Sequence, residues 1–362
     1  QKWIAVTGTN GKTTTVEMTA AILKAAGIKA TACGNVGDTV IDAIERDDPY
    51  EVLVLELSSF QLHWAEQAEF QAAAILNIAD DHLDWHGSFD AYAAAKFSIL
   101  DRTDVAILNA DDGAVVTRAN RFKDRKVFFS LNTPAPGEIG VVEELLVDRA
   151  FVNDPQQASM ICELVDIVPT VPHNVSNALA AAGLARAMNV PHDVIQKALQ
   201  AFRPGRHRIE TIHEADGITW VDDSKATNPH ATAASLMSHL SVVWIAGGLA
   251  KGADMDSMVQ RCAPRMKAAI LIGEDRGLIE AALIKHAPTV PRILIDSPVD
   301  YTRGGDSNSL MESIVSAASK HAESGDTVLL APACASMDQF ISYADRGDRF
   351  AAAVRKVIAH EA

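Results

Sequence analysis

A short apolar run that leads into a glycine-rich turn constrains the fold of this chain more than any other segment. Residues 3–7 (WIAVT) have the composition of a buried strand, residues 8–14 (GTNGKTT) follow directly, and a helical pattern covers 13–26. A strand, a loop of small residues and a helix N-terminus together place backbone N–H groups around an anion. Lys12 adds a cation for the β- and γ-phosphates, and Thr13 adds a hydroxyl for Mg²⁺. The segment predicts a nucleoside triphosphate site in an α/β domain.

The spacing of this loop is a variant of the usual phosphate-binding pattern. That pattern has a glycine five positions before the second glycine, which is Gly11 here, and Val6 occupies the position. The alternative interpretation is a plain Gly-Asn turn between a strand and a helix. The polar residues further along the chain do not fit a P-loop GTPase or a small-molecule kinase.

Length and composition narrow the class of protein. A chain of 362 residues predicts two domains, and no apolar run approaches the roughly 20 residues that span a bilayer. The excess of 47 Asp and Glu over 32 Lys and Arg argues against nucleic acid binding and favours a small ligand held by local cations. Four cysteines without a C-x-x-C pair indicate neither a zinc ribbon nor a disulfide framework, so we expect a reducing cytoplasm. The cysteines are Cys33, Cys162, Cys262 and Cys334.

Alternation of apolar runs and helical patterns predicts a parallel sheet wrapped by helices in the first domain. Strands are expected at 52–57, 72–78 and 105–108, with a helix over 89–101. A turn at Pro134, Pro136 and Gly137 interrupts this rhythm, so residues 126–172 should form a small, more antiparallel patch. Its short strands are expected at 127–130, 145–151 and 161–168, and helices at 175–189 and 192–202 follow.

Pro204 and Gly205 mark the expected boundary between a domain of residues 1–204 and a second domain of residues 205–362. The second domain again has the alternation of a doubly wound, Rossmann-like α/β fold. Its strands are expected at 218–222, 242–246, 268–272, 292–295 and 327–331, and its helices at 228–238, 277–286, 308–321 and 346–360.

Three polar side chains of the first domain are candidates for chemistry. Glu56 ends a strand-like run, where an open α/β sheet places its ligands, and is a candidate for holding a metal ion. His82 follows the next strand and could bind a divalent cation or phosphate, with Asp81 orienting it. A polar surface loop is the alternative. Lys96 lies in a helix after three alanines, and from the sequence alone it is expected on the surface.

Eight ordered blocks, spread over essentially the whole chain, resemble the Mur ligases that build the peptidoglycan stem peptide. They are TGTNGKTT, LELSSFQL, DDHLDWHGS with YAAAK, HNVSNALAA (173–181), GRHRIE (205–210), DDSKATNPHA (222–231), GGLAKGAD (247–254) and APACASMDQF (331–340). The last four are most similar to the branch of the family that adds D-glutamate to UDP-N-acetylmuramoyl-L-alanine (UDP-MurNAc-L-Ala). The resemblance implies a cytoplasmic, monomeric enzyme with a P-loop-type central domain and a Rossmann-like C-terminal domain.

The resemblance also implies roles for individual residues. Thr13 and Glu56 would lie near one Mg²⁺, and His82 with a carbamylated Lys96 would serve a second; a carbamate supplies the oxygen ligand that Mg²⁺ prefers. Lys12, Glu56, His82 and Lys96 would be catalytic. ATP would contact Gly8, Thr9, Asn10, Gly11, Lys12, Thr13, Thr14, Asn177, Arg208 and Asp223. Asn35 and Ser58 would contact the muramoyl-alanine end, and Lys225, Thr227, Lys251 and Ser336 would contact D-glutamate and phosphate.

One departure from the family and two rival functions remain at this point. Mur ligases carry an N-terminal domain that holds the UDP of the acceptor, and nothing precedes Gln1 here, so we expect the acceptor-binding half of the site to be incomplete. The rival functions are a folylpolyglutamate-synthetase-like ligase and a nucleotide-sensing protein without turnover. The DSKATN block disfavours the first, and retention of Glu56, His82 and Lys96 disfavours the second.

Overall fold

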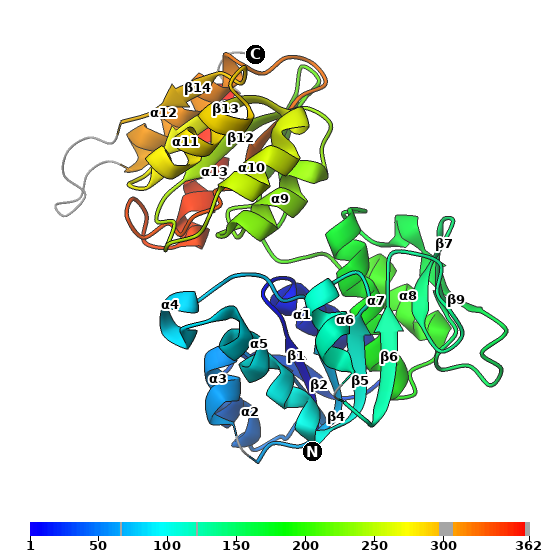
Figure 1. Ribbon diagram of the computed structural model, residues 1–362. Coiled ribbons are helices and arrows are strands. Elements are labelled where there is room, and N and C mark those ends of the chain that lie inside the picture. Colours follow the sequence, from blue (N-terminus) through cyan, green and yellow to red (C-terminus); the bar gives the residue numbers. More distant parts are fainter. Residues whose placement is uncertain (66, 121, 297–306, 359–362) are drawn as a thin grey trace. The chain divides into compact units, whose positions relative to one another are not determined.

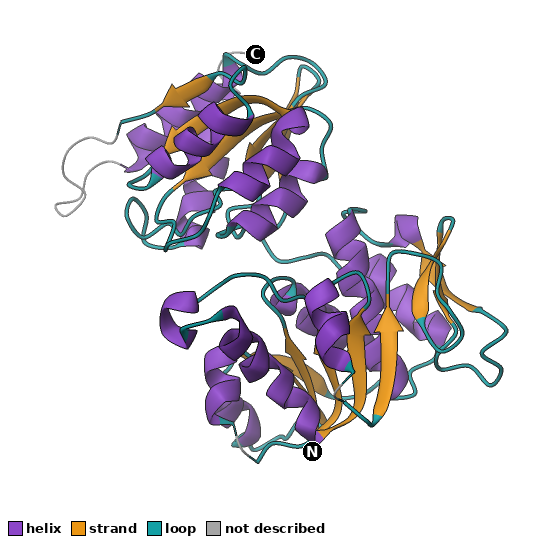
Figure 2. Ribbon diagram, viewed as in Figure 1, coloured by secondary structure: helices purple, strands orange, loops and turns teal. Residues whose placement is uncertain are grey.

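The computed structural model describes residues 1–65, 67–120, 122–296 and 307–358. The contacts within the chain divide it into two compact units, Gln1–Pro204 and Gly205–Ala362. Each unit is an α/β structure built around its own sheet (Figure 1, Figure 2). No described helix is long and apolar enough to cross a lipid bilayer.

The described part of the first unit contains a nine-stranded sheet in the order β2-β3-β1-β4-β5-β6-β7-β8-β9. Strands β2 to β6 pair in parallel, and β7, β8 and β9 pair antiparallel, which confirms the expected antiparallel patch. The strands are β1 (Lys2–Thr7), β2 (Ala30–Gly34), β3 (Val52–Glu56), β4 (Phe70–Ile75), β5 (Thr103–Asn109), β6 (Arg125–Phe129), β7 (Ile139–Val142), β8 (Leu145–Asp148) and β9 (Ser159–Glu163).

Helices cover both faces of this sheet, because its central strands are apolar on both sides. Along β1, Ile4 and Val6 pack into the core beneath α1, α7 and α8, and Ala5 packs into the core beneath α2, α3, α5 and α6. The helices are α1 (Lys12–Ala25), α2 (Val40–Ile44), α3 (Ser59–Trp64), α4 (Leu83–His86), α5 (Phe89–Phe97), α6 (Gly113–Ala119), α7 (Pro172–Ala187) and α8 (His192–Ala201).

Several elements of the first unit end earlier than the sequence patterns predict. Strand β8 stops at Asp148, whose carboxylate accepts hydrogen bonds from the N–H groups of Ala150 and Phe151 and so turns the chain. Strand β9 stops at Glu163, where a reciprocal cap begins the 3₁₀ turn Leu164–Asp166. The helix expected over 89–101 changes to a 3₁₀ helix at Ser98–Arg102.

The second unit contains a described six-stranded sheet in the order β10-β11-β15-β12-β13-β14. All neighbours are parallel except the antiparallel pair of β10 and β11. The strands are β10 (Glu210–Ala215), β11 (Ile218–Asp222), β12 (Val242–Gly247), β13 (Met266–Ile272), β14 (Arg292–Leu294) and β15 (Thr327–Leu330).

Helices α12 and α13 bury one face of this second sheet, where Phe350 and Ile314 join Trp220, Val243 and Ile245 in one core. The alternate residue of β12, Trp244, is also fully buried and faces the opposite layer. The helices are α9 (Pro229–Met237), α10 (Asp256–Cys262), α11 (Arg276–His286), α12 (Ser307–Ser319) and α13 (Tyr343–Ile358). The last residues of the helix expected over 346–360 lie outside the described residues.

Candidate functional site

The glycine-rich turn connects β1 to α1 at the carboxyl edge of the first sheet. Gly11 precedes the first helical residue, Lys12, with φ of 83°, a left-handed conformation that favours glycine. A Cβ atom at Gly11 would lie 2.4 Å from Oδ1 of Asn177 on α7. Position 11 therefore requires glycine for two reasons, the left-handed backbone conformation and the close approach of Asn177. The structure brings Asn177, a residue expected to hold ATP, against the loop itself.

Two residues that the sequence analysis missed hold the loop in place. Asn77, after β4, accepts a hydrogen bond from the N–H of Asn10 at 2.8 Å and donates one to the carbonyl of Asn10 at 3.0 Å. The hydroxyls of Thr9 and Tyr92 lie 3.0 Å apart, so α5 is also attached to the loop. Nothing in the sequence links positions 10, 77 and 92, because sheet order alone makes them neighbours.

Lys96 is buried, with 2% of its surface exposed, although the sequence alone suggested an exposed lysine. Its Nζ donates to the carbonyl oxygen of Gly8 at 2.9 Å and lies 4.7 Å from the centre of the Tyr92 ring. Burial, together with the nearby Lys12 ammonium, lowers the pKa of Lys96 to about 6, although the carboxylates of Asp81 and Glu56 act in the opposite direction. The side chain is therefore a neutral amine at pH 7.5.

Lys12 begins α1 directly after the glycine-rich loop. Its ammonium donates to the carbonyl oxygens of Gly8 (2.9 Å) and Thr9 (2.8 Å). Lys96 donates to that same carbonyl of Gly8, so the two amines approach the loop together. Thr13 and Thr14 follow in the first turn of α1, where their backbone N–H groups face the helix N-terminus.

Glu56 ends β3, beside the strand that carries the loop, and is 3% exposed. Its Oε1 accepts a hydrogen bond from the Asn35 side chain at 3.0 Å, whereas its buried Oε2 has no hydrogen-bond partner among the described residues. A buried carboxylate oxygen without a donor is costly unless a cation balances it. Glu56 therefore fits a ligand of a hard divalent cation, and Asn35 orients it.

His82 and Ser58 lie in the loops after β4 and β3, the strands on either side of β1. His82 has φ of 53°, its Nε2 is 3.6 Å from the Asp81 carboxylate, and its ring packs edge-on against Phe60. Ser58 caps α3 through the N–H of Gln61. The first unit thus gathers Asn35, Glu56, Ser58, the glycine-rich loop and His82 along one edge of four adjacent strands.

The second unit gathers its candidate residues at the carboxyl edges of β11, β15 and β12, which are adjacent in its sheet. Asp223 directly follows β11. Burial raises the pKa of Asp223 to about 7, and the Ser235 hydroxyl and the Arg208 cation act in the opposite direction. The expected nucleotide residues Arg208 and Asp223 are therefore electrostatic neighbours.

The residues expected to hold D-glutamate lie on loops that follow these three strands. Lys225 and Thr227 follow β11, and the Lys225 ammonium sits 3.9 Å from the centre of the Tyr343 ring. Lys251 is exposed, with φ of 51°, in the loop after β12. Ser336 follows β15, and the backbones of Leu249 and Ala335 exchange two hydrogen bonds of 2.9 Å that tie its loop to that of Lys251. Tyr343 is a further residue that the sequence analysis missed.

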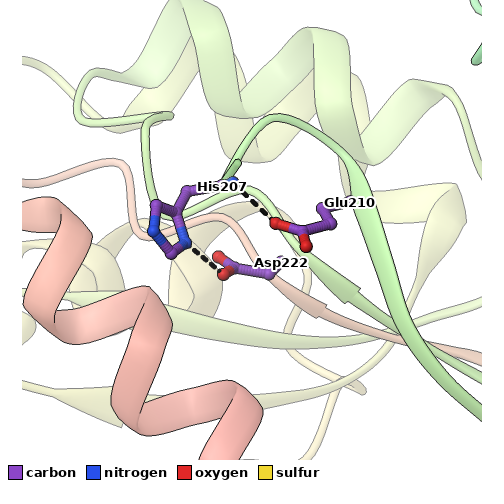
Figure 3. A group of neighbouring side chains, drawn as sticks. All are labelled: His207, Glu210 and Asp222. Carbon is purple, nitrogen blue, oxygen red and sulfur yellow. Dashed lines mark hydrogen bonds and ion pairs between the residues drawn. The ribbon is translucent and has the colours of Figure 1, made fainter. Parts of the chain in front are cut away.

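A cluster of His207, Glu210 and Asp222 lies where the second unit begins (Figure 3). His207 Nδ1 is 2.6 Å from Asp222, and the N–H of His207 donates to Glu210 at 2.9 Å. A Cβ at Gly347 would lie 2.2 Å from His207 Nδ1, so only glycine lets α13 pack there. Because these groups already satisfy one another, the cluster serves to hold the strained turn at His207 and Ile209, both at positive φ.

Comparisons with known proteins show the family of this chain. Residues 6–185 match the Mur ligase middle domain, and residues 207–334 match the Mur ligase, glutamate ligase domain. The UDP-N-acetylmuramoylalanine–D-glutamate ligase of Streptomyces coelicolor is 52% identical over 361 residues, covering 98% of this chain and 75% of that protein. The enzyme of the same name from Mycobacterium avium is 49% identical, covering 99% of this chain and 76% of its own length.

Solved structures share the fold at low sequence identity. The MurF ligase from Thermotoga maritima in complex with ADP has a TM-score of 0.70 at 18% identity, covering 100% of this chain and 81% of its own. A pseudomurein peptide ligase type C from Methanothermus fervidus has a TM-score of 0.73 at 19% identity, covering 100% and 79%. The mostly parallel α/β architecture expected from the sequence is confirmed, and this chain belongs to the Mur ligase family, within the group of the UDP-N-acetylmuramoylalanine–D-glutamate ligases.

Proposed function

We propose that this chain catalyses the ATP-dependent addition of D-glutamate to UDP-MurNAc-L-Ala in the synthesis of peptidoglycan precursors. The observation that carries the proposal is one sheet edge with a phosphate loop, a buried neutral lysine and a buried carboxylate oxygen that has no donor among the described residues. The relatives named for this reaction are about half identical to the chain over nearly its whole length. We expect the enzyme to act in the cytoplasm as a monomer.

The reaction has two steps. A carboxylate oxygen of UDP-MurNAc-L-Ala attacks the γ-phosphorus of ATP, the bond to ADP breaks, and an acyl phosphate forms. The amine of D-glutamate then attacks the acyl carbon, and phosphate and a proton leave as the amide forms. Lys12 and the backbone N–H groups of residues 8–14 stabilise the charge that develops on the phosphate oxygens.

The residues of the first unit fit two Mg²⁺ ions. Thr13 and Glu56 would hold one, and His82 with Lys96 would hold the other. Mg²⁺ bound there would shield the charge of the triphosphate. Mg²⁺ prefers oxygen ligands, and Lys96 could supply them only as a carbamate. Its neutral amine is the form that adds CO₂ to become a carbamate, with release of one proton. We therefore propose that Lys96 is carbamylated.

The second unit supplies the cations for the amino acid. D-Glutamate carries two carboxylates, and Lys225 and Lys251 lie on neighbouring loops with the hydroxyls of Thr227 and Ser336. Charge-assisted hydrogen bonds from such groups are about twice as strong as neutral ones. We propose that these four residues hold the carboxylates of D-glutamate and the phosphate, and that Arg208 and Asp223 contact the nucleotide.

A substrate panel tests this function. Phosphate release by the full-length protein is measured with ATP, UDP-MurNAc-L-Ala and single amino acids, and separately with a pterin acceptor and L-glutamate. The proposal expects release and amide formation with D-glutamate and UDP-MurNAc-L-Ala only. Release with the pterin acceptor would support the folylpolyglutamate alternative, and nucleotide binding without release would support a sensor.

A further inference from the structure

Arg346, on α13, is a buried cation that takes no part in the proposed reaction. Its side chain is 0% exposed, and no carboxylate among the described residues forms a direct ion pair with it, although Asp338 and Asp222 act on it electrostatically. The guanidinium instead donates to Ser224 Oγ at 2.9 Å, to the Ser224 carbonyl at 3.0 Å, to the Cys334 carbonyl at 3.3 Å and to the Gly247 carbonyl at 3.5 Å. One side chain thus contacts three separate segments.

These segments are the three loops that carry the proposed D-glutamate residues. Ser224 immediately precedes Lys225, Gly247 ends β12 before the loop of Lys251, and Cys334 lies two residues before Ser336. The strands that lead into the loops are adjacent in the sheet, in the order β11-β15-β12. Arg346 therefore lies beneath the place where the three loops meet.

Stability alone does not account for an arginine here. Burial lowers the pKa of Arg346 to about 10, so the group stays charged at neutral pH and carries the desolvation cost of a buried ion. Apolar side chains of similar volume usually stabilise such a position as well or better. What an apolar side chain or a lysine lacks is the rigid planar fork, whose separate N–H groups reach three loops at once.

We propose that Arg346 is a positioning residue that fixes the relative placement of the three loops and thereby sets the geometry of the amino-acid pocket. The proposal rests on the proposed function, because it assigns that pocket to D-glutamate. Arg346 acts through Lys225, Lys251 and Ser336 and not by contact with a substrate. A misplacement of such groups by about 1 Å can reduce the rate about a hundredfold.

The test compares substitutions of Arg346 with a core substitution on the same helix. Arg346→Met removes the donors, Arg346→Lys keeps the charge but not the fork, and Phe350→Leu loosens the core that α13 shares with Trp220. Steady-state kinetics are measured in full-length enzyme for ATP and for D-glutamate separately. We expect Arg346→Met to raise the KM for D-glutamate or lower kcat at least about tenfold, with the KM for ATP changed less than about twofold.

Arg346→Lys should fall between the wild type and Arg346→Met, and Phe350→Leu should lower the unfolding midpoint without changing the KM for D-glutamate. Hydrogen exchange of the wild type and Arg346→Lys supplies a second readout: residues 222–228, 247–253 and 331–338 should all exchange faster in the variant. This readout, with the kinetics of Arg346→Lys, decides the matter if Arg346→Met does not fold.

The proposal is overturned if the D-glutamate kinetics of both arginine variants match the wild type. It is also overturned if Phe350→Leu, at a similar loss of stability, changes the D-glutamate kinetics as much as the arginine variants do. Faster exchange confined to one loop also overturns it. A wild-type enzyme that releases no phosphate in response to D-glutamate would instead reject the proposed function, so the two failures are distinguishable.

Discussion

Replacing Lys96 by methionine should stabilise the protein and abolish its activity at the same time. In the folded state Lys96 is neutral at pH 7.5, because burial lowers its pKa from 10.5 to about 6. In the unfolded chain the pKa of Lys96 is 10.5, which lies three units above pH 7.5. Keeping Lys96 neutral in the folded protein at pH 7.5 therefore costs about 4 kcal/mol of folding free energy. Methionine avoids that cost. It loses the hydrogen bond to Gly8, worth about 1 kcal/mol, and a long, weak one to the Thr7 hydroxyl at 3.5 Å. The net expected gain is about 3 kcal/mol.

The sign of the pH dependence follows from proton binding. Between the folded pKa of about 6 and the unfolded value of 10.5, the unfolded chain binds more protons at Lys96 than the folded protein does. The wild type therefore gains stability as pH rises through this window. At pH 9.5 the cost of keeping Lys96 neutral falls to about 1.4 kcal/mol, so the net advantage of Lys96→Met should fall to about 0.4 kcal/mol. Urea unfolding of both proteins in CO₂-free buffer at pH 7.5 and 9.5 measures this difference.

Bicarbonate connects this stability measurement to function. About 97% of an amine with a pKa near 6 is neutral at pH 7.5, against about 0.1% of an ordinary lysine. Labelled ¹³C-bicarbonate should therefore give a carbamate signal in the wild type and in the control Lys320→Met, an exposed lysine, but not in Lys96→Met. Short carboxylic acids should partly restore the activity of Lys96→Ala. A Lys96→Met protein that is less stable than the wild type at pH 7.5, or fully active, would refute this reasoning.

Three further substitutions test the sites individually. Glu56→Gln, which replaces a carboxylate with an amide, should raise the Mg²⁺ concentration for half-maximal activity about tenfold or more in a metal titration, and an unchanged titration would remove Glu56 from the metal site. Gly11→Ala should abolish ATP binding in calorimetry, whereas Gly27→Ala, also at positive φ but with open space around its Cβ, should lose only stability. The Asp222 carboxylate raises the pKa of His207, so that pair stabilises the fold below pH 6.5 and the contribution is lost as pH rises through the raised pKa. Unfolding midpoints of Asp222→Asn should lack this loss; the same pH profile as the wild type would show that the pair contributes nothing.

The sequence predicted the elements whose residues are buried throughout. Strands β3 and β12 are continuous apolar runs and were found close to their true bounds. Strand β10 was missed because its six residues (ETIHEA) include none that is fully buried, and β2 was missed because its small residues (ATACG) lack the β-branched pattern of a strand. Helices α2 and α3 are too short for a helical period to show.

The candidate site divides in the same way. The glycine-rich loop could be recognised as a candidate phosphate site from adjacent residues, because the chemistry that it predicts is local. The burial of Lys96 could not, since a helical lysine after three alanines is usually exposed and only the packing of α5 against the loop encloses it. The contacts of Arg346 join positions more than 90 residues apart in the chain for Gly247 and Ser224, and strand order alone creates them.

The fate of one oxygen atom tests the central claim most directly. UDP-MurNAc-L-Ala labelled with ¹⁸O in its terminal carboxylate is incubated with ATP, D-glutamate and the full-length enzyme, and the released phosphate is analysed by mass spectrometry. The carboxylate oxygen that bonds to the γ-phosphorus leaves with the phosphate. Each amide formed should therefore be accompanied by one phosphate that carries one ¹⁸O atom. Amide formation with unlabelled phosphate would contradict the acyl-phosphate mechanism, and no amide with D-glutamate would contradict the proposed function.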